Sequence, residues 1–284
     1  MKKILQDLSL EELKILTESY GEKPYRAKQI RSALHSGRKI SEITDISKDF
    51  RAKLLEEYED EPVRIIKKLV SSDGTEKFLL ELSDGNVIES VLMKYKYGNT
   101  QCISTQVGCR MNCAFCASGL NGLVRNLSSG EIASEIFAVN REAGGNLENR
   151  KVTNVVLMGS GEPLDNYANV VKFLREITAD GGINISQRNI SLSTSGLVPE
   201  MYKFADEKMG VNLSVSLHNP FDEKRRRIMP VAKKYSVKEK LGACSYYFEK
   251  TGRRYYFEYT LIDGENCDEA HANALAKLLK EYEE

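Results

Sequence analysis

The chain has 284 residues, enough for one large domain or one domain with a smaller companion, and this excludes a mini-protein held together by disulfides. Its composition, 41% hydrophobic and 29% charged, is typical of a globular chain, and no apolar run approaches the roughly 18 residues of a membrane span. Lys and Arg total 41, as do Asp and Glu, so no global positive field indicates nucleic acid and no membrane association is expected.

The first 70 residues predict a small helical domain. They begin with an early acid at Asp7 and without the apolar stretch of a secretory signal, so a cytoplasmic protein is expected. Leucines at positions 10, 13 and 16 recur at helical spacing, and the helical pattern continues to about residue 70. The domain carries a basic run without an intervening acid, formed by Lys23, Arg26, Lys28, Arg31, Arg38 and Lys39. This run could lie against phosphate, although charged runs are more often solvated helix faces.

A β-hairpin is predicted over residues 71–98, connecting the helical domain to the rest of the chain. Two β-rich runs, 75–82 and 87–95, flank the turn sequence Ser83-Asp84-Gly85-Asn86. Residues 99–284 are predicted to form an α/β core, with strands at 152–158, 190–193, 211–217 and 254–262 and helices at 128–143, 167–178, 198–208, 236–250 and 268–283. Such alternation indicates a parallel sheet with functional residues at the carboxyl ends of its strands.

Cysteines are the most informative residues of the chain. Four of the six, Cys102, Cys109, Cys113 and Cys116, fall within fifteen residues, and in a reducing compartment such crowding favours a metal or redox site over a disulfide. The last three have the spacing C-x3-C-x2-C, which lets three thiolates turn toward one centre. A structural zinc site needs a fourth ligand, for which His218 is the only plausible candidate. A [4Fe–4S] cluster needs only three cysteines and then keeps one iron open for a substrate.

A glycine-rich turn follows the first strand after this loop. Met158-Gly159-Ser160-Gly161-Glu162-Pro163-Leu164 lets the backbone approach a ligand, and Glu162 can accept a hydrogen bond from an ammonium group. Alone, the turn would be an ordinary connection between a strand and a helix. One strand after a three-cysteine loop, it indicates a binding site.

These two motifs together resemble the signature of the radical S-adenosylmethionine enzymes. Four further segments follow in order, at residues 122–127, 192–196, 216–218 and 227–230. Together with the two motifs they make the sequence similar to the RNA adenine-C2 methyltransferase family (RlmN), and the similarity extends over essentially the whole chain. The resemblance implies an α/β fold, a partial (β/α)6 radical SAM barrel that is incomplete at its C-terminus because its last strand and helix are missing. It also implies a [4Fe–4S] cluster and S-adenosylmethionine as cofactors.

The resemblance also assigns roles by position. It implies that Cys109, Cys113 and Cys116 ligate the cluster. The implied contacts to S-adenosylmethionine are Gly161, Glu162, Ser193, Ser216, Leu217 and His218. Glu89 matches the general base, although a surface carboxylate of the hairpin is the plainer alternative. Cys102 matches a cysteine that forms a transient disulfide with a methyl-carrying cysteine.

The methyl-carrying cysteine is the point where this sequence departs from the family. In the family it lies in a C-terminal segment containing Cys-Gly-Gln-Leu, and neither Cys244 nor Cys267 has that context. The polypeptide as given is therefore expected to be a truncated representative that can hold a cluster but cannot complete turnover.

The implied activity is methylation of C2 of an adenine in 23S rRNA at the peptidyl-transferase centre, by a ping-pong mechanism through an S-methylcysteine. The resemblance admits the adenine beside the anticodon of tRNA as a second substrate, and implies a reducing partner such as flavodoxin or ferredoxin and a monomeric protein. RNA selection is expected from the helical domain, with a second basic run at 224–227 and 233–234. Two alternatives stay open: a related adenine-C8 methyltransferase that confers antibiotic resistance, against which Pro163 weighs, and an inactive iron–sulfur protein that binds RNA.

Overall fold

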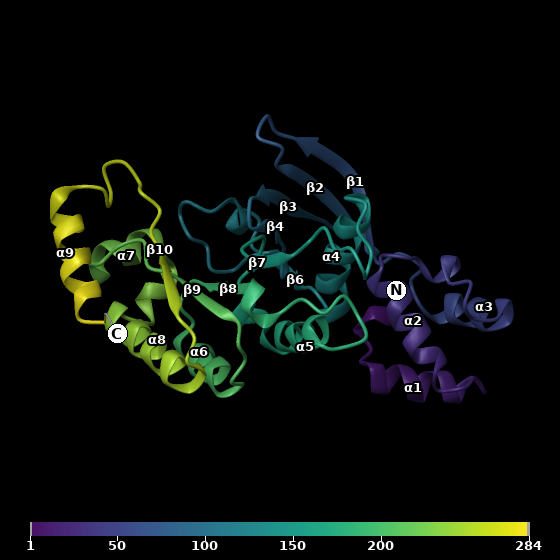
Figure 1. Ribbon diagram of the computed structural model, residues 1–284. Helices are drawn as coiled ribbons and strands as arrows, with labels where there is room; N and C mark the ends of the chain where they lie inside the picture. The colour runs from purple at the N-terminus through teal and green to yellow at the C-terminus, as the bar shows by residue number, and fades with distance from the viewer. Residues whose placement is uncertain (1, 283–284) are drawn as a thin grey trace.

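The computed structural model describes residues 2–282, arranged as helices around one large mixed sheet. In Figure 1 the N-terminal helices lie at one end of the molecule, the sheet occupies the middle, and helix α9 (Glu269–Lys280) lies at the opposite end. Among the described residues, no helix combines the length and the apolar composition that crossing a bilayer requires.

The predicted N-terminal helical region is confirmed as far as residue 57. Helices α1 (Leu10–Ser19), α2 (Arg26–His35) and α3 (Lys48–Glu57), with the short 3-10 turns η1 (Leu5–Asp7) and η2 (Ile40–Glu42), surround their own apolar core. The helical prediction for the end of this stretch is wrong, because Val63–Val70 forms strand β1 and pairs with its neighbour in the sheet. This run is rich in Val and Ile, whose branched side chains favour extended backbone.

The predicted hairpin is confirmed, and it forms part of the main sheet. Strands β2 (Glu76–Leu82) and β3 (Val87–Tyr95) pair antiparallel, and β4 (Gly98–Cys102) continues that pattern. On its other side β4 pairs parallel with β7 (Asn154–Leu157), which is followed by β8 (Ile190–Thr194), β9 (Asn212–Ser216) and β10 (Tyr255–Glu258). The sheet is therefore antiparallel from β1 to β4 and parallel from β4 to β10. A separate two-stranded sheet joins β5 (Gln106–Gly108) and β6 (Leu123–Asn126).

Helices alternate with the parallel strands as predicted. They are α4 (Ser129–Glu142), α5 (Tyr167–Thr178), α6 (Val198–Asp206) and α8 (Val237–Thr251). Helix α7 (Asp222–Ile228) was not predicted, and Glu283, expected to end the last helix, lies outside the described residues. Short 3-10 turns are η3 (Ala117–Gly119), η4 (Pro163–Asn166), η5 (Gln187–Asn189) and η6 (Pro230–Lys233).

The last strand is shorter than predicted. It ends at Glu258 because the following amides bond to side chains: Thr260 N–H donates to His218 Nδ1 and Ile262 N–H donates to Asn266 Oδ1. Amides used in this way are not available to extend a strand ladder.

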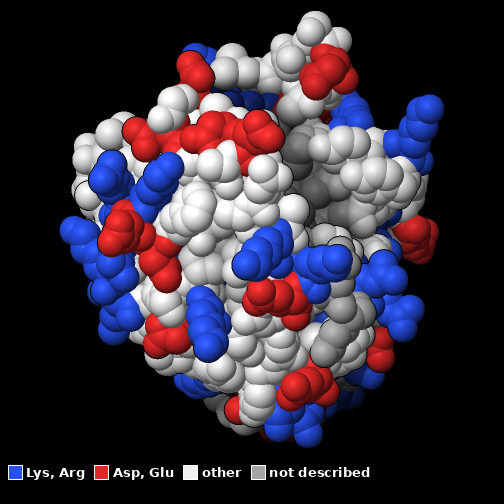
Figure 2. Space-filling view, turned by 90° about the vertical axis from the view of Figure 1, so that its left-hand side faces the viewer, with Lys and Arg blue, Asp and Glu red and all other residues white. Residues whose placement is uncertain are grey.

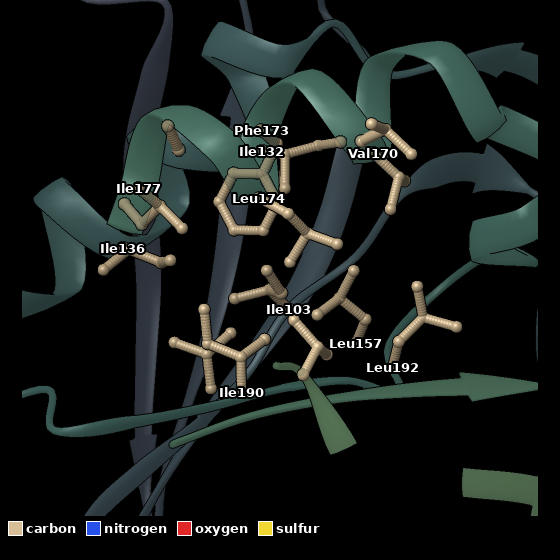
Figure 3. Packing of buried hydrophobic residues seen from close by; sticks show 14 of the residues in the cluster. Ile103, Ile132, Ile136, Leu157, Val170, Phe173, Leu174, Ile177, Ile190 and Leu192 are labelled. Carbon is tan, nitrogen blue, oxygen red and sulfur yellow. The ribbon is translucent and has the colours of Figure 1, made fainter. Parts of the chain in front are cut away.

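Strand register determines which face of the sheet packs on helices. Cys102 pairs with Val156, Val156 with Ser191, Ser191 with Asn212 and Tyr256 with Ser214, so these residues share one face. Most of the intervening residues are apolar, and they point to the opposite face. Figure 3 shows four of them, Ile103, Leu157, Ile190 and Leu192, packed against α4 and α5 side chains of the same buried cluster. The polar face therefore remains for function.

Candidate active site

The polar face of the sheet brings together side chains from five strands. By register it carries Glu89 from β3, Cys102 from β4, Ser193 from β8, Ser216 from β9 and Glu258 from β10. A cavity of about 550 Å³ opens on this face, lined by Met93, Asn154, Met158, Ser191, Asn212 and Tyr256 among others. This cavity extends toward the amino ends of β7 and β9, and none of the five polar side chains named above lines it.

The three-cysteine loop follows β5 and is closed by main-chain hydrogen bonds. Cys109 N–H donates to Gly122 O over 3.0 Å, and Cys116 N–H donates to Cys113 O over 3.0 Å. Gly108, immediately before the loop, has φ +76° and lies so close to the Gly122 carbonyl that a Cβ atom would be 2.0 Å from its oxygen. Only glycine fits there, because both the conformation and the close approach exclude a side chain.

The thiols of this loop influence one another electrostatically. Burial, together with negative charge on Cys116 and Cys109, raises the pKa of Cys113 to about 12. Burial likewise raises the pKa of Cys109 to about 11, whereas Cys116 is exposed. The three thiols therefore lie near one another, and without a metal Cys109 and Cys113 stay protonated at neutral pH.

This donor set fits an iron–sulfur cluster. Within residues 2–282, no three His, Cys, Asp or Glu side chains are placed to hold a single metal ion. Three neighbouring cysteine thiols are the donors that a [4Fe–4S] cluster requires, with each cysteine on a different iron. Cluster binding would then deprotonate the buried thiols, because metal ligation requires the thiolate.

The glycine-rich turn after β7 is held tightly in place. Gly161 has φ +109°, and a Cβ there would be 2.6 Å from the Cβ of Gln106. The Glu162 carboxylate is buried and accepts hydrogen bonds from Ser195 N–H over 2.7 Å and from Leu164 N–H over 3.1 Å. Burial raises the pKa of Glu162, and these donors oppose that rise. The carboxylate thus links the ends of β7 and β8 whether or not it also contacts a ligand.

Gln106 joins this turn to the cysteine loop, a role that sequence reasoning missed. Its Oε1 accepts from Glu162 N–H over 2.9 Å, and its Nε2 donates to Asp165 Oδ2 over 2.9 Å and to Asn126 Oδ1 over 2.8 Å. Asp165 also accepts from Arg110 Nε over 3.0 Å, and Arg110 lies inside the cysteine loop. Buried Gln106 therefore holds the two motifs in a fixed relation.

A cluster of hydroxyl groups and one carboxylate ends β8, β9 and β10. Ser193 Oγ donates to Glu258 at 2.9 Å from Oε1, and Ser216 Oγ lies 3.1 Å from Oε2 of the same side chain. Glu258 was not among the predicted site residues. Its place in the predicted strand 254–262 was the only available signal, and the strand's true end was not visible in the sequence.

His218 follows Leu217 just beyond β9, in the left-handed conformation with φ +54°. Its Nδ1 accepts from Thr260 N–H over 3.0 Å, and its ring meets the edge of Phe115 of the cysteine loop at 4.8 Å between centroids. Burial, together with the charges of Lys240 and Arg225, lowers the pKa of His218 to about 4. The imidazole is therefore neutral at physiological pH and lies against the cysteine loop.

Glu89 and Cys102 share the polar face but differ in environment. Glu89 is exposed and forms an ion pair with Lys77 at 2.7 Å. Cys102 is half-buried, and burial raises its pKa to about 11, with a further rise from the charge of Glu135. All six cysteines, which lie within residues 2–282, are free, so the structure does not support the expected disulfide.

The basic run of the helical domain is largely paired with acids or with the main chain. Arg31 is buried and bonds Glu176 of α5 at 2.6 Å, while Arg38 pairs with Asp45 and Lys39 with Glu61. Arg31 in particular is a packing residue, because its exposed fraction is only 2%.

Figure 2 shows the opposite side of the molecule, which carries α9. Basic and acidic side chains are interleaved there, so no uniform basic patch covers that face.

Comparisons with known proteins agree with this geometry. Residues 103–275 match the family model described as "Radical SAM superfamily", and residues 4–59 match "Ribosomal RNA large subunit methyltransferase N-terminal domain". A solved structure, "Crystal Structure of a radical SAM methyltransferase from Sphaerobacter thermophilus", superposes with a TM-score of 0.93 at 40% identity, covering 98% of this chain and 82% of that one.

Two curated relatives carry the description "Probable dual-specificity RNA methyltransferase RlmN". The protein of Lachnoclostridium phytofermentans is 51% identical over 279 residues, 97% of this chain and 77% of that protein. The protein of Clostridium perfringens strain SM101 is 53% identical over 283 residues, 99% of this chain and 80% of that protein. The fold and the three-cysteine site define a radical SAM enzyme, which uses a [4Fe–4S] cluster and S-adenosylmethionine. Within that class, the chain belongs to the RlmN family of methyltransferases.

Proposed function

We propose that the protein to which this sequence belongs methylates C2 of an adenine in 23S rRNA and of the adenine beside the anticodon in tRNA, through an S-methylcysteine whose role neither Cys244 nor Cys267 fills. The relatives' description as dual-specificity RNA methyltransferases supports two RNA substrates. The observation that carries the proposal is the cysteine loop beside a polar sheet face that presents Glu89 and Cys102.

The chain's own residues can hold both cofactors. Cys109, Cys113 and Cys116 would ligate the cluster, which when bound supplies the electron that cleaves the sulfonium of S-adenosylmethionine. The groups offered to S-adenosylmethionine come from the ends of the parallel strands, namely Gly161, Glu162, Ser193, Ser216, Leu217 and His218. A neutral imidazole suits this place, because a protonated one would repel the positive sulfonium.

Two residues on the same face would serve the RNA base. The Glu89 carboxylate is accessible and accepts the proton leaving C2, as a general base must. The thiol of Cys102 lies on the same face, and we propose that it acts in the steps that release the product. In the proposed division of labour the N-terminal helices up to Glu57 select the RNA, and the core over 99–284 carries the chemistry. The strands β1 to β3 between them belong to the main sheet, so the boundaries expected at 70 and 98 are not domain boundaries of the structure. We further propose a cytoplasmic monomer reduced by flavodoxin or ferredoxin.

The radical site is tested by anaerobic reconstitution with iron and sulfide. The expected result is about four irons per chain and reductive formation of 5′-deoxyadenosine from S-adenosylmethionine. The variant with all three loop cysteines changed to alanine should show neither. Uptake of zinc without iron would overturn the radical mechanism.

The RNA position is tested in the source cell. 23S rRNA and tRNA from cells with and without the gene are digested to nucleosides and analysed by mass spectrometry. Loss of 2-methyladenosine from both RNAs on deletion is expected, and the intact gene but not its Cys113→Ala form should restore it. Loss of 8-methyladenosine instead would assign the C8 reaction, and unchanged methylation would favour an RNA-binding iron–sulfur protein.

A further inference from the structure

The cavity of about 550 Å³ at the amino ends of β7 and β9 is separate from the polar cluster of the candidate site and is lined by aromatic rings. Its three tyrosines are all exposed, Tyr97 to 75%, Tyr256 to 52% and Tyr95 to 46%. The rings of Tyr95 and Tyr97 are stacked, with centroids 5.0 Å apart and planes inclined by 8°. Exposed apolar surface gathered in one place is typical of a binding site, and these rings offer flat faces to a ligand.

The charge of the cavity is positive. Arg188 lines it and is exposed, and within residues 2–282 its guanidinium forms no hydrogen bond and no ion pair. Lys96 lies between the two stacked tyrosines in the sequence, is also exposed, and has no acidic partner in the described part of the chain. No Asp or Glu is among the residues that line the cavity. The cavity therefore suits a ligand that combines a flat ring with negative charge.

Amide side chains provide hydrogen-bonding groups on the same wall. Asn154 donates from Nδ2 to Thr153 Oγ1 over 3.1 Å, and Asn189 donates from Nδ2 to Thr153 O over 3.3 Å. The Oδ1 atoms of both amides accept no hydrogen bond from the described residues, so they can accept one from a ligand. Stacking on aromatic rings, combined with hydrogen bonds to the edge of the base, is how proteins bind unpaired RNA bases.

The cavity adjoins the strand that carries Cys102. Thr100, two residues before Cys102 on β4 and on the same face, lines the cavity, as does Val156, which pairs with Cys102. Two residues along a strand span about 7 Å. An RNA whose target adenine reaches Cys102 therefore brings the adjacent nucleotide within reach of the cavity.

We propose that this cavity binds an unpaired nucleotide of the substrate RNA, next to the adenine that is methylated. The base stacks on Tyr97, and Arg188 and Lys96 pair with the phosphates. The inference rests on the proposed function, because it takes RNA as the substrate. Stacking tolerates any base, so the cavity holds the strand in place and does not read its sequence.

The test measures binding of the reconstituted protein to an anticodon stem-loop RNA that carries the adenine beside the anticodon, by fluorescence anisotropy. Tyr97→Ala removes the ring and should raise the dissociation constant by about 5- to 150-fold, whereas Tyr97→Phe keeps the ring and should bind like the parent. The matched control is Tyr202→Ala, because Tyr202 is an exposed tyrosine of α6 that packs against another ring, Tyr246. It should leave the affinity unchanged. Parental affinity in Tyr97→Ala would overturn the inference.

A second variant tests the contact with phosphate and does not depend on the first. Removing one phosphate contact to a single strand should make the plot of the logarithm of the association constant against that of the salt concentration shallower by about 0.7. This change is expected in Arg188→Gln and not in Lys277→Gln, which removes an exposed lysine of α9. The parental salt dependence in Arg188→Gln would contradict the assignment of Arg188 to phosphate.

The outcomes separate this inference from the proposed function. Formation of 5′-deoxyadenosine should be parental in Tyr97→Ala and Arg188→Gln, which also shows that the variants are folded. If the parent binds the RNA and both variants bind it equally well, the inference is wrong and the proposed function stands. A parent that binds no RNA would refute both. If adenosine monophosphate binds the parent and not Tyr97→Ala, while the RNA binds both alike, the cavity takes a free nucleotide and the assignment to RNA is overturned.

Discussion

Replacing Gly161 by alanine should lower both the free energy of unfolding and the affinity for S-adenosylmethionine. Its φ of +109° is a conformation that side chains avoid, and this strain costs about 1 to 3 kcal/mol. The new Cβ would lie 2.6 Å from Gln106 Cβ and 2.9 Å from Gln106 N. Such overlap in a packed region costs about another 1 to 3 kcal/mol. The free energy of unfolding should therefore fall by about 2 to 6 kcal/mol.

The overlap has a functional consequence because Gln106 must move. Its Oε1 holds the Glu162 amide at 2.9 Å, so the turn should loosen and the affinity for S-adenosylmethionine should fall. Urea unfolding measures the stability of the variant, and calorimetric titration of reconstituted protein with S-adenosylmethionine measures its affinity.

A matched control isolates the overlap from the backbone strain. Gly181 has φ +78°, and a Cβ there would meet nothing within 4 Å. In Gly181→Ala the free energy of unfolding should therefore fall only by the backbone strain, and the affinity for S-adenosylmethionine should be unchanged. Equal losses of stability and affinity in Gly161→Ala and Gly181→Ala would refute the reasoning.

Three further predictions concern buried polar groups. Gln106→Leu leaves the Glu162 amide without its acceptor, so urea unfolding should show a loss of about 1 to 3 kcal/mol. Arg31→Ala breaks the buried pair with Glu176, and thermal unfolding should show a loss of about 2 kcal/mol, smaller than for fully buried pairs because Glu176 is partly exposed. Burial lowers the pKa of His35 to about 3 from its usual 6.5, so only the unfolded chain binds a proton as pH falls through that range. Its contribution to stability is present above pH 6.5 and is lost toward pH 3, by about 1.4 kcal/mol per pKa unit.

Each of these predictions has a control. Gln29 is half-buried and accepts from Arg26 Nη1, so Gln29→Leu should lose much less stability than Gln106→Leu. Lys28→Ala, on the exposed side of the helix that carries Arg31, should keep parental stability; equal losses would contradict the packing role of Arg31. For the pH dependence, His35→Gln should flatten the acid limb relative to the parent. Parallel limbs in the two proteins would show that other groups dominate.

Local signals in the sequence were sufficient for much of the fold. Ser128 and Glu131 correctly predicted the start of α4, and both hydrogen bonds of the capping box are present. The strands ahead of Glu162 and His218 were visible as apolar runs, and their carboxyl ends do carry the polar cluster. The prediction of helix up to residue 70 failed because β1 pairs with β2 from Val63 to Val70. Tertiary pairing of this kind overrides the local helical pattern on which the prediction was based.

The supporting residues of the site were beyond sequence reasoning. Glu258 and Gln106 acquire their roles from side-chain partners at least 20 positions away in the chain. Arg225 was visible only as one member of a basic run, and Arg31 as one member of another. In each basic run one side chain is fully buried while its neighbours are exposed to water. The packing of the helices determines which side chain is buried, and the sequence of the run does not show it.

Strand β1 has a consequence for how molecules of this protein meet one another. It forms one edge of the main sheet, and its pairing with β2 is interrupted by a bulge between Ile65 and Lys67. Lys67 and Lys68 are exposed there. A bulge and adjacent lysines discourage a strand from a neighbouring molecule from adding to an open edge. The bulge and the two lysines therefore oppose strand addition at this edge, although the same strand also exposes Ile66, Leu69 and Val70 to solvent.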